Sequence, residues 1–152
     1  MKNKDDSSAI HAIAFDFDGV LAESVEVKTR AYALLFNEEK EEAVSQFVDY
    51  HIKNGGISRF ETIKVLYRDI LQRPLSEKRF QELVLRFSNL EIDEVVAAPW
   101  EAGAREFLSQ NEKQYSFFIV SGTPEEELDE IVRRRGMTHY FDSVRGSPKD
   151  KV

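Results

Sequence analysis

The amino-acid sequence predicts an α/β protein in which a helical segment is inserted after the first strand of a parallel sheet. Two short apolar runs, residues 10–15 and 115–120, have the composition of buried strands. Between them, residues 25–96 carry apolar side chains at helical spacing. A helix and a further strand candidate follow the second run. The succession of strand, helix and strand indicates parallel pairing.

Three segments are the candidates for strands. Residues 10–15 are almost continuously apolar, which predicts a strand buried on both faces. Residues 115–120 are rich in aromatic and β-branched side chains and predict a second buried strand. Residues 140–144 form a shorter third candidate. Small or carboxylate residues follow each segment, so we expect polar groups at the strand ends.

The long segment between the first two strands has the periodicity of helices. Apolar residues at helical spacing predict amphipathic helices around residues 27–35, 44–52, 63–70 and 80–87, and in the last two segments they stand at i, i+3, i+4 and i+7. A direct crossover between parallel strands needs only about a dozen residues. We therefore expect residues 25–96 to form an inserted all-helical domain, and residues 1–24 and 97–152 to form the α/β core. The crossover helix is expected around residues 102–108.

Helix-start signals follow the second strand. Thr123 has the position of an N-cap residue, Pro124 of the first helical residue, and Glu126 of the partner that closes a capping box. Gly136 is expected to end this helix. Thr123 is therefore predicted to cap the helix.

The composition excludes several classes of protein. The chain of 152 residues carries 21 basic and 28 acidic side chains, a formal charge of −7, which argues against general binding to nucleic acid or to an anionic membrane. No apolar run reaches the roughly 20 residues of a transmembrane helix, and the polar first residues do not lead into a signal peptide. We expect a cytoplasmic protein. Because the chain has no cysteine, thiol catalysis and thiolate zinc sites are excluded.

Two carboxylates mark the end of the first strand. Asp16 and Asp18 are two residues apart, at the edge where open parallel sheets bind ligands. Such a pair suits a hard divalent cation, and it also supplies a nucleophile together with a proton donor. A solvated turn is the simpler explanation of an Asp-x-Asp-Gly segment taken alone.

Polar groups at the ends of the next two strands favour a ligand site. Ser121 and Gly122 end the second strand, where a hydroxyl and backbone N–H groups suit an anion. Lys149 and Lys151 follow the third strand and offer a cation for phosphate. Carboxylates, hydroxyl and lysine thus follow successive strands in that order.

On these residues the sequence resembles the phosphatases of the haloacid dehalogenase (HAD) superfamily, and it is similar to phosphoglycolate phosphatases and β-phosphoglucomutases with a helical cap. The resemblance begins at residue 10, and residues 14–21 are its most specific part. It implies a Rossmann-like sheet in which Asp16 is the nucleophile, Asp18 the general acid/base and Ser121 the phosphate-binding hydroxyl.

The resemblance also implies a cofactor and further ligands. Mg²⁺ would be held by the Asp16 carboxylate and by the backbone carbonyl of Asp18. Gly122 would approach the phosphate through its backbone. We prefer Lys151 over Lys149 as the phosphate lysine, because Lys151 stands nearer the expected start of the next helix.

One loop of the cap resembles the cap loop that faces the active site in these relatives. It comprises residues 55–59. Ser58 and Glu61 also fit an ordinary capping box, which is the simpler interpretation of that serine. Arg59 is expected to contact a second anionic group on the substrate, because its guanidinium suits such a group.

The resulting expectation is a Mg²⁺-dependent phosphatase that hydrolyses a small phosphorylated metabolite through an aspartyl-phosphate. A phosphomutase that uses the same residues is the alternative among enzymes. A non-catalytic binding domain that has kept the fold is the alternative outside them. Free phosphate as product would indicate the phosphatase, and an isomerised sugar phosphate the mutase.

We also expect the natural gene to continue beyond residue 152. The resemblance implies further strands on the other side of the first strand, and acidic residues there that complete the Mg²⁺ shell. About 50 to 80 more residues would hold two or three strand and helix units of ordinary length. Without them, residues 10–15 are expected to form an exposed sheet edge.

Overall fold

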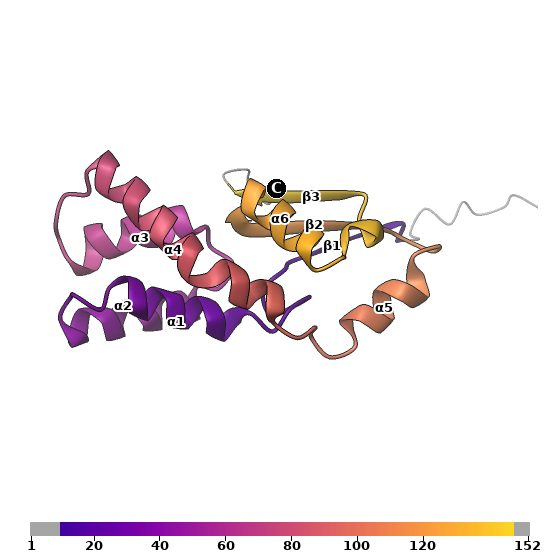
Figure 1. Ribbon diagram of the computed structural model, residues 1–152, viewed down its shortest axis with the longest axis horizontal. Helices are drawn as coiled ribbons and strands as arrows, with labels where there is room; N and C mark the ends of the chain where they lie inside the picture. The colour runs from indigo at the N-terminus through magenta and orange to yellow at the C-terminus, as the bar shows by residue number, and fades with distance from the viewer. Residues whose placement is uncertain (1–9, 148–152) are drawn as a thin grey trace, which may run out of the picture.

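The computed structural model describes residues 10–147, and within them the chain has the predicted α/β architecture. A three-stranded sheet has the order β1-β2-β3, and both pairings are parallel. Its strands are β1 (Ala12–Phe15), β2 (Ser116–Pro124) and β3 (Ser143–Ser147). In Figure 1 the sheet lies at one end of the molecule and the helical insertion at the other.

The second and third strands differ from the prediction at their ends. Pairing between β2 and β3 passes an irregularity after Val120 and resumes where Pro124 faces Ser147. The second strand therefore continues through residues that have helix-start signals. The third strand begins later than predicted, because Tyr140 belongs to a short 3-10 helix, Thr138–Tyr140.

The first strand is covered on one face. Ile13 and Phe15 pack against the hydrophobic cluster of the sheet, whereas Ala12 and Ala14 are exposed and Ile10 is 68% exposed. Within residues 10–147, β1 pairs with β2 alone. The prediction of a strand buried on both faces is therefore wrong for the described chain, in which the outer edge of β1 has no neighbouring strand.

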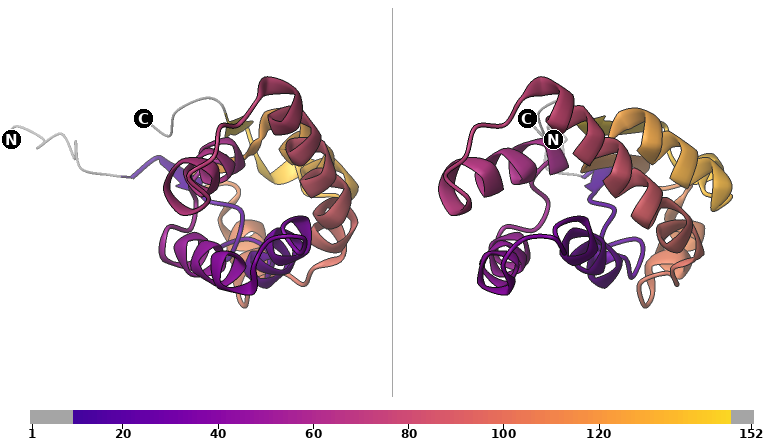
Figure 2. Two further views of the ribbon diagram at one scale, coloured as in Figure 1. Left: turned by 90° about the vertical axis from the view of Figure 1, so that its left-hand side faces the viewer. Right: turned by 60° about the vertical axis from the view of Figure 1, so that its left-hand side comes forward.

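Helices occur in the insertion where the apolar periodicity predicts them. They are α1 (Val25–Leu35), α2 (Glu41–Lys53), α3 (Arg59–Val65) with a π-helical turn after it (Leu66–Ile70), and α4 (Glu77–Ala97). The last helix is much longer than its apolar pattern suggests, and it begins where the Ser76 side chain accepts a hydrogen bond from Arg79 N (3.2 Å). Seen from the end of the insertion, these helices surround a common interior (Figure 2).

Two hydrophobic clusters lie in the described chain. One is centred on the sheet and includes Phe17, Phe117 and Leu128, and the other lies among the helices of the insertion and includes Phe47 and Phe87. We propose on this basis that, among the described residues, the core comprises residues 10–24 and 97–147 and the helical cap comprises residues 25–96. Both α1 and α4 also send a side chain into the sheet cluster, so the cap is packed against the core.

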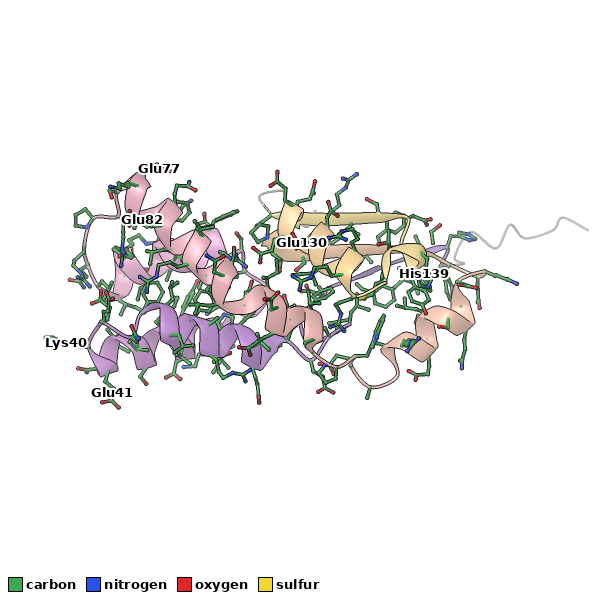
Figure 3. The ribbon with its side chains drawn as sticks, in the orientation of Figure 1. Lys40, Glu41, Glu77, Glu82, Glu130 and His139 are labelled. Carbon is green, nitrogen blue, oxygen red and sulfur yellow. The ribbon has the colours of Figure 1, made fainter. Side chains whose placement is uncertain are left out.

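The remaining helices cover the sheet. They are α5 (Ala104–Asn111) and α6 (Glu125–Arg134), and α6 packs on β2, on β3 and on α4. Charged side chains such as Glu77, Glu82 and Glu130 project outward from the helices (Figure 3). Every helix in the described part of the chain is too short or too polar to cross a membrane.

Candidate active site

Asp16 and Asp18 lie directly after β1, on either side of a fully buried phenylalanine. Phe17 anchors this turn, and its carbonyl accepts a hydrogen bond from Leu21 N (2.9 Å). Gly19 has a φ of 72°, a value that side chains other than glycine rarely adopt. The Asp16 Oδ1 accepts a hydrogen bond from Phe17 N (2.8 Å). This local structure places both carboxylates on the wall of one cavity of about 260 Å³.

The cavity lies between the core and the cap. Its core wall comprises Asp16, Asp18, Gly122 and Thr123, and its cap wall includes Lys28, Tyr32, His51, Arg59, Phe87 and residues 55–57. The structure thus brings together the sequence-predicted Asp16, Asp18, Gly122 and Arg59. Ser121 is buried beside the cavity and accepts a hydrogen bond from Thr123 N (3.2 Å). Lys149 and Lys151 lie outside the described residues.

The predicted cap of the helix after β2 is wrong. Helix α6 begins at Glu125, its N-cap residue is Pro124, and no side chain caps it. Because β2 continues through Pro124, Thr123 remains extended and its hydroxyl turns to the cavity. There the hydroxyl accepts a hydrogen bond from Lys28 Nζ (2.7 Å).

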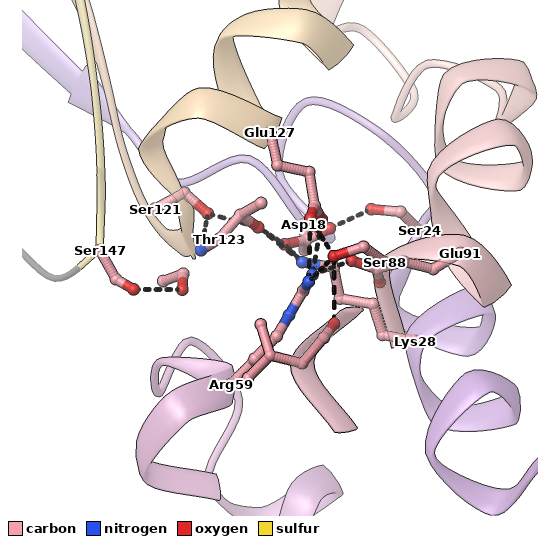
Figure 4. Close-up of polar contacts among 12 residues, drawn as sticks. Asp18, Ser24, Lys28, Arg59, Ser88, Glu91, Ser121, Thr123, Glu127 and Ser147 are labelled. Atoms are coloured by element: carbon pink, nitrogen blue, oxygen red, sulfur yellow. Dashed lines mark hydrogen bonds and ion pairs between the residues drawn. The ribbon is translucent and has the colours of Figure 1, made fainter. Parts of the chain in front are cut away.

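Lys28 connects the cap to the predicted acid/base residue (Figure 4). Its Nζ is 2.6 Å from the Oδ2 of Asp18, whose Oδ1 accepts a hydrogen bond from Ser24 Oγ (2.6 Å). Burial acts to lower the pKa of Lys28, but the charge of Asp18 and the hydrogen bond to Asp18 act against burial, and this pKa lies above its usual value. The side chain is therefore an ammonium ion held against Asp18.

The sequence interpretation did not single out Lys28. Val25, Lys28 and Tyr32 stand at positions i, i+3 and i+7 of one helix and line the same cavity. A lysine on a helix face with a valine and a tyrosine is the signal that could have identified it.

The cap loop packs closely against the core at Gly122. A Cβ built on this glycine would stand 2.7 Å from the carbonyl oxygen of Gly56. The Ser147 hydroxyl donates to the carbonyl of Gly122 (3.0 Å), and its oxygen lies within hydrogen-bond distance of Ser58 Oγ (3.0 Å). The space that the small residue leaves open is therefore filled by the cap loop, and phosphate binding by the Gly122 backbone stays a prediction.

Arg59 is buried among protein carboxylates. Only 3% of it is exposed, and its guanidinium forms a bidentate pair with Glu127 at 2.9 and 2.6 Å. It also pairs with Glu91 and donates to Ser88 Oγ (2.6 Å). These contacts join α3 and α4 of the cap to α6 of the core (Figure 4).

The structure confirms the predicted capping role of Ser58, but it does not test the predicted substrate contact of Arg59. Ser58 is the N-cap residue of α3 and accepts a hydrogen bond from Phe60 N (3.2 Å), as the structural interpretation predicts. The capping box with Glu61 is not formed, because Ser58 accepts from Phe60 N and the Glu61 carboxylate pairs with Lys64 (2.8 Å). The substrate contact of Arg59 stays a prediction, since Glu127 already pairs with its charge and Glu91 also contacts its guanidinium, although Arg59 lines the cavity as well.

The two carboxylates around Arg59 differ in their affinity for protons. Burial raises the pKa of Glu91 to about 8, although Lys28 and Arg59 act against this rise. Burial also acts to raise the pKa of Glu127, but its hydrogen bonds and charge pairing with Arg59 outweigh burial and lower this pKa. Glu91 is therefore the member of the pair that holds a proton at neutral pH.

A pH-dependent stability follows from the raised pKa of Glu91. The folded chain keeps a proton until about pH 8, whereas the unfolded chain releases it near the ordinary value of 4.5. Between these values the unfolded state binds fewer protons, so the free energy of unfolding falls as pH rises, by on the order of a few kcal/mol. Glu91→Gln resembles the protonated carboxyl, and it is expected to reduce this slope in urea unfolding at pH 5 to 9.

The matched control for that experiment is Glu82→Gln. Glu82 lies on the same helix but is exposed, so its replacement should leave the slope unchanged. A wild-type slope in the Glu91→Gln variant would contradict the assignment.

The donor set at the end of β1 fits Mg²⁺. This ion takes oxygen ligands, and proteins commonly hold it by one or two carboxylates together with water and substrate phosphate. Asp16 and Asp18 supply such oxygens on the cavity wall. Within residues 10–147, no cluster of three or more metal-binding side chains occurs.

A known protein family matches the chain. The family of haloacid dehalogenase-like hydrolases matches residues 10–152. No curated protein sequence matches the chain.

Several solved structures share the fold. A predicted phosphoglycolate phosphatase from Haemophilus somnus 129PT has a TM-score of 0.68 at 16% identity, over 94% of this chain and 65% of that chain. YfnB from Bacillus subtilis, bound to magnesium, has a TM-score of 0.62 at 17% identity, over 91% of this chain and 65% of that chain. CbbY from Rhodobacter sphaeroides, in complex with phosphate, has a TM-score of 0.70 at 16% identity, over 95% of this chain and 66% of that chain. The chain thus spans 65% to 66% of the length of these proteins.

Proposed function

Because the chain belongs to the family of haloacid dehalogenase-like hydrolases, we propose that it is a Mg²⁺-dependent phosphatase that hydrolyses a small phosphomonoester. The observation that carries the proposal is the position of Asp16 and Asp18 on one wall of a cavity that the cap closes from the other side. A cavity of about 260 Å³ limits the leaving group to a small one.

The two carboxylates divide the reaction between them. An oxygen of Asp16 attacks phosphorus, and the bond to the leaving oxygen breaks as Asp18 protonates that oxygen. Asp18 then removes a proton from water, whose oxygen attacks the aspartyl-phosphate and releases phosphate and the free Asp16 carboxylate. When bound by the Asp16 carboxylate and the Asp18 carbonyl, Mg²⁺ would neutralise charge on the transferring phosphoryl group.

The contacts of Asp18 fit a residue that changes its hydrogen bonds during turnover. Ser24 and Lys28 donate to its two oxygens. To protonate the leaving group, Asp18 must first carry a proton on one of its oxygens. That oxygen can then no longer accept a hydrogen bond from Ser24 or Lys28 in the present arrangement. We therefore expect substrate binding to displace one of the two contacts.

The remaining site residues are proposed as anion ligands. Ser121 and Gly122 lie near the end of β2, and Gly122 lines the cavity together with the two carboxylates. A hydroxyl and backbone N–H groups at this place suit phosphate oxygens. Lys151 is proposed as the phosphate lysine. Arg59 is proposed as a contact for a second anionic group of the substrate, in addition to its bonds with Glu91 and Glu127.

The test is a screen of phosphomonoesters with the full chain in the presence of Mg²⁺. Phosphate release is measured, and the organic products are identified in parallel. Release of phosphate that stops on chelation of Mg²⁺ is the expected result. An isomerised sugar phosphate without free phosphate would identify a mutase, and no reaction with any ester would contradict the proposed activity.

A further inference from the structure

His51 is a cavity residue that no step of the proposed reaction uses. It lies in the last turn of α2 and lines the same cavity as Asp16 and Asp18. Its ring packs against Tyr32, with 4.8 Å between the ring centroids. The Nε2 atom is buried and has no hydrogen-bond partner among residues 10–147. Buried polar atoms almost always have a partner, so this atom indicates a ligand that contacts it.

The unpartnered buried atoms are concentrated in the cap. Within the described chain, the buried side-chain atoms without a partner are His51 Nε2, Arg59 Nε and Glu91 Oε2. His51 and Arg59 both line the cavity, and Glu91 pairs with the guanidinium of Arg59. Such atoms would each lower the stability of a dry interior. Because His51 and Arg59 line the cap wall of the cavity, opposite Asp16 and Asp18, their unpartnered atoms point to polar groups of the substrate's leaving portion.

The surroundings of His51 favour its neutral imidazole form and therefore an uncharged hydrogen-bond partner. Burial lowers the pKa of His51, and the ammonium of Lys28 on α1 lowers it further, whereas Asp18 in the core opposes this effect. A neutral imidazole either donates or accepts at Nε2, depending on its tautomer. A hydroxyl group matches both cases, because it is itself a donor and an acceptor.

Resting on the proposed phosphatase function, we propose that His51 is a specificity-determining residue whose Nε2 hydrogen-bonds a hydroxyl group of the leaving group. The aromatic rings of Tyr32 and Phe87 on the same wall pack against the carbon skeleton of that group. The site therefore prefers small polyhydroxylated phosphates over esters of similar size that have no hydroxyl.

The experiment compares two substrates that differ in their leaving group: a pentose 5-phosphate, whose leaving group carries hydroxyls, and phenyl phosphate, whose leaving group carries no further hydroxyl. His51→Phe keeps an aromatic ring against Tyr32 but removes both ring nitrogens. The ratio of kcat/KM for the pentose ester to kcat/KM for phenyl phosphate is expected to fall roughly tenfold, the effect of losing one hydrogen bond. His139→Phe is the matched control, because His139 is exposed and does not line the cavity, and its ratio should stay at the wild-type value.

A second variant and a binding measurement complete the test. His51→Gln keeps a donor and an acceptor, and it should retain more of the preference than His51→Phe. Calorimetric titration of the pentose ester into Asp16→Asn, with and without His51→Phe, measures binding without turnover, and the added change should weaken binding by a similar factor. Equal losses on both substrates, or no loss on either, would overturn the role of His51. A wild-type chain that binds the pentose ester through His51 but hydrolyses nothing would instead overturn the proposed phosphatase activity alone.

Discussion

Replacing Asp16 with asparagine is expected to abolish turnover while leaving the fold unchanged. Asparagine has almost the same volume as aspartate, and its oxygen can still accept the hydrogen bond that Asp16 Oδ1 receives from Phe17 N (2.8 Å). The amide oxygen is a far weaker nucleophile than a carboxylate, so the aspartyl-phosphate does not form. We expect a loss of activity on the order of 10³-fold or more.

The measurement is the Mg²⁺-dependent release of phosphate, with thermal unfolding in parallel. Asp129→Asn on α6 is the matched control, since Asp129 is exposed and lies outside the cavity. This control should keep both the activity and the melting temperature of the wild type. An Asp16→Asn variant that retains wild-type turnover would show that another group attacks phosphorus.

The architecture was predictable because it follows from local patterns. Continuous apolar runs predicted the strands, and the i, i+3, i+4 spacing predicted each helix of the insertion. The ends of elements were less predictable, because long-range pairing decides them. Thr123 and Pro124 have the residue types of a helix start, yet pairing with β3 keeps them in the strand. The same pairing explains why a predicted capping residue became part of the cavity wall.

The candidate site was predictable in its core half and, through the cap loop of residues 55–59, in part of its cap wall. Asp16 and Asp18 are two residues apart and follow a recognisable strand, so a local pattern was enough to find them. Arg59 is separated by 32 residues from Glu91 and by 68 from Glu127, and no local pattern predicts such contacts. One signal did exist in α4, where Glu91 stands four residues after the buried Phe87 and four before the buried Val95. A carboxylate on the buried face of a helix indicates a buried partner.

Removing the guanidinium of Arg59 is expected to destabilise the chain strongly. In Arg59→Met, Glu127 and Glu91 would remain buried at the contact between cap and core with no guanidinium beside them. Breaking a buried ion pair by removing one partner typically lowers the free energy of unfolding by about 3–5 kcal/mol, because a charge is left without compensation. Urea unfolding at pH 7 measures this loss.

A solvent-exposed pair on the same cap provides the control for that loss. Arg30 and Glu94 form an ion pair at 2.9 Å, with both side chains 58% exposed. Solvent screens such a pair, so Arg30→Met should lower the free energy of unfolding by less than about 1 kcal/mol. The double variant Arg59→Met with Glu127→Gln should regain much of the stability, because it removes the stranded charge together with its partner.

The same Arg59→Met variant separates the two roles that the sequence and the structure assign to this arginine. A substrate contact alone would raise KM and leave stability at the wild-type value, as the sequence-based expectation of a second anion site requires. If Arg59 only links α3, α4 and α6, its replacement would lower stability. It would then also change kcat/KM by the same factor for esters with and without a second anionic group. Because Arg59 is buried against two carboxylates and also lines the cavity, we expect the stability loss together with a larger fall in kcat/KM for the ester that carries the second anion. An Arg59→Met chain as stable as the wild type would contradict the buried ion pair as the main role of this residue.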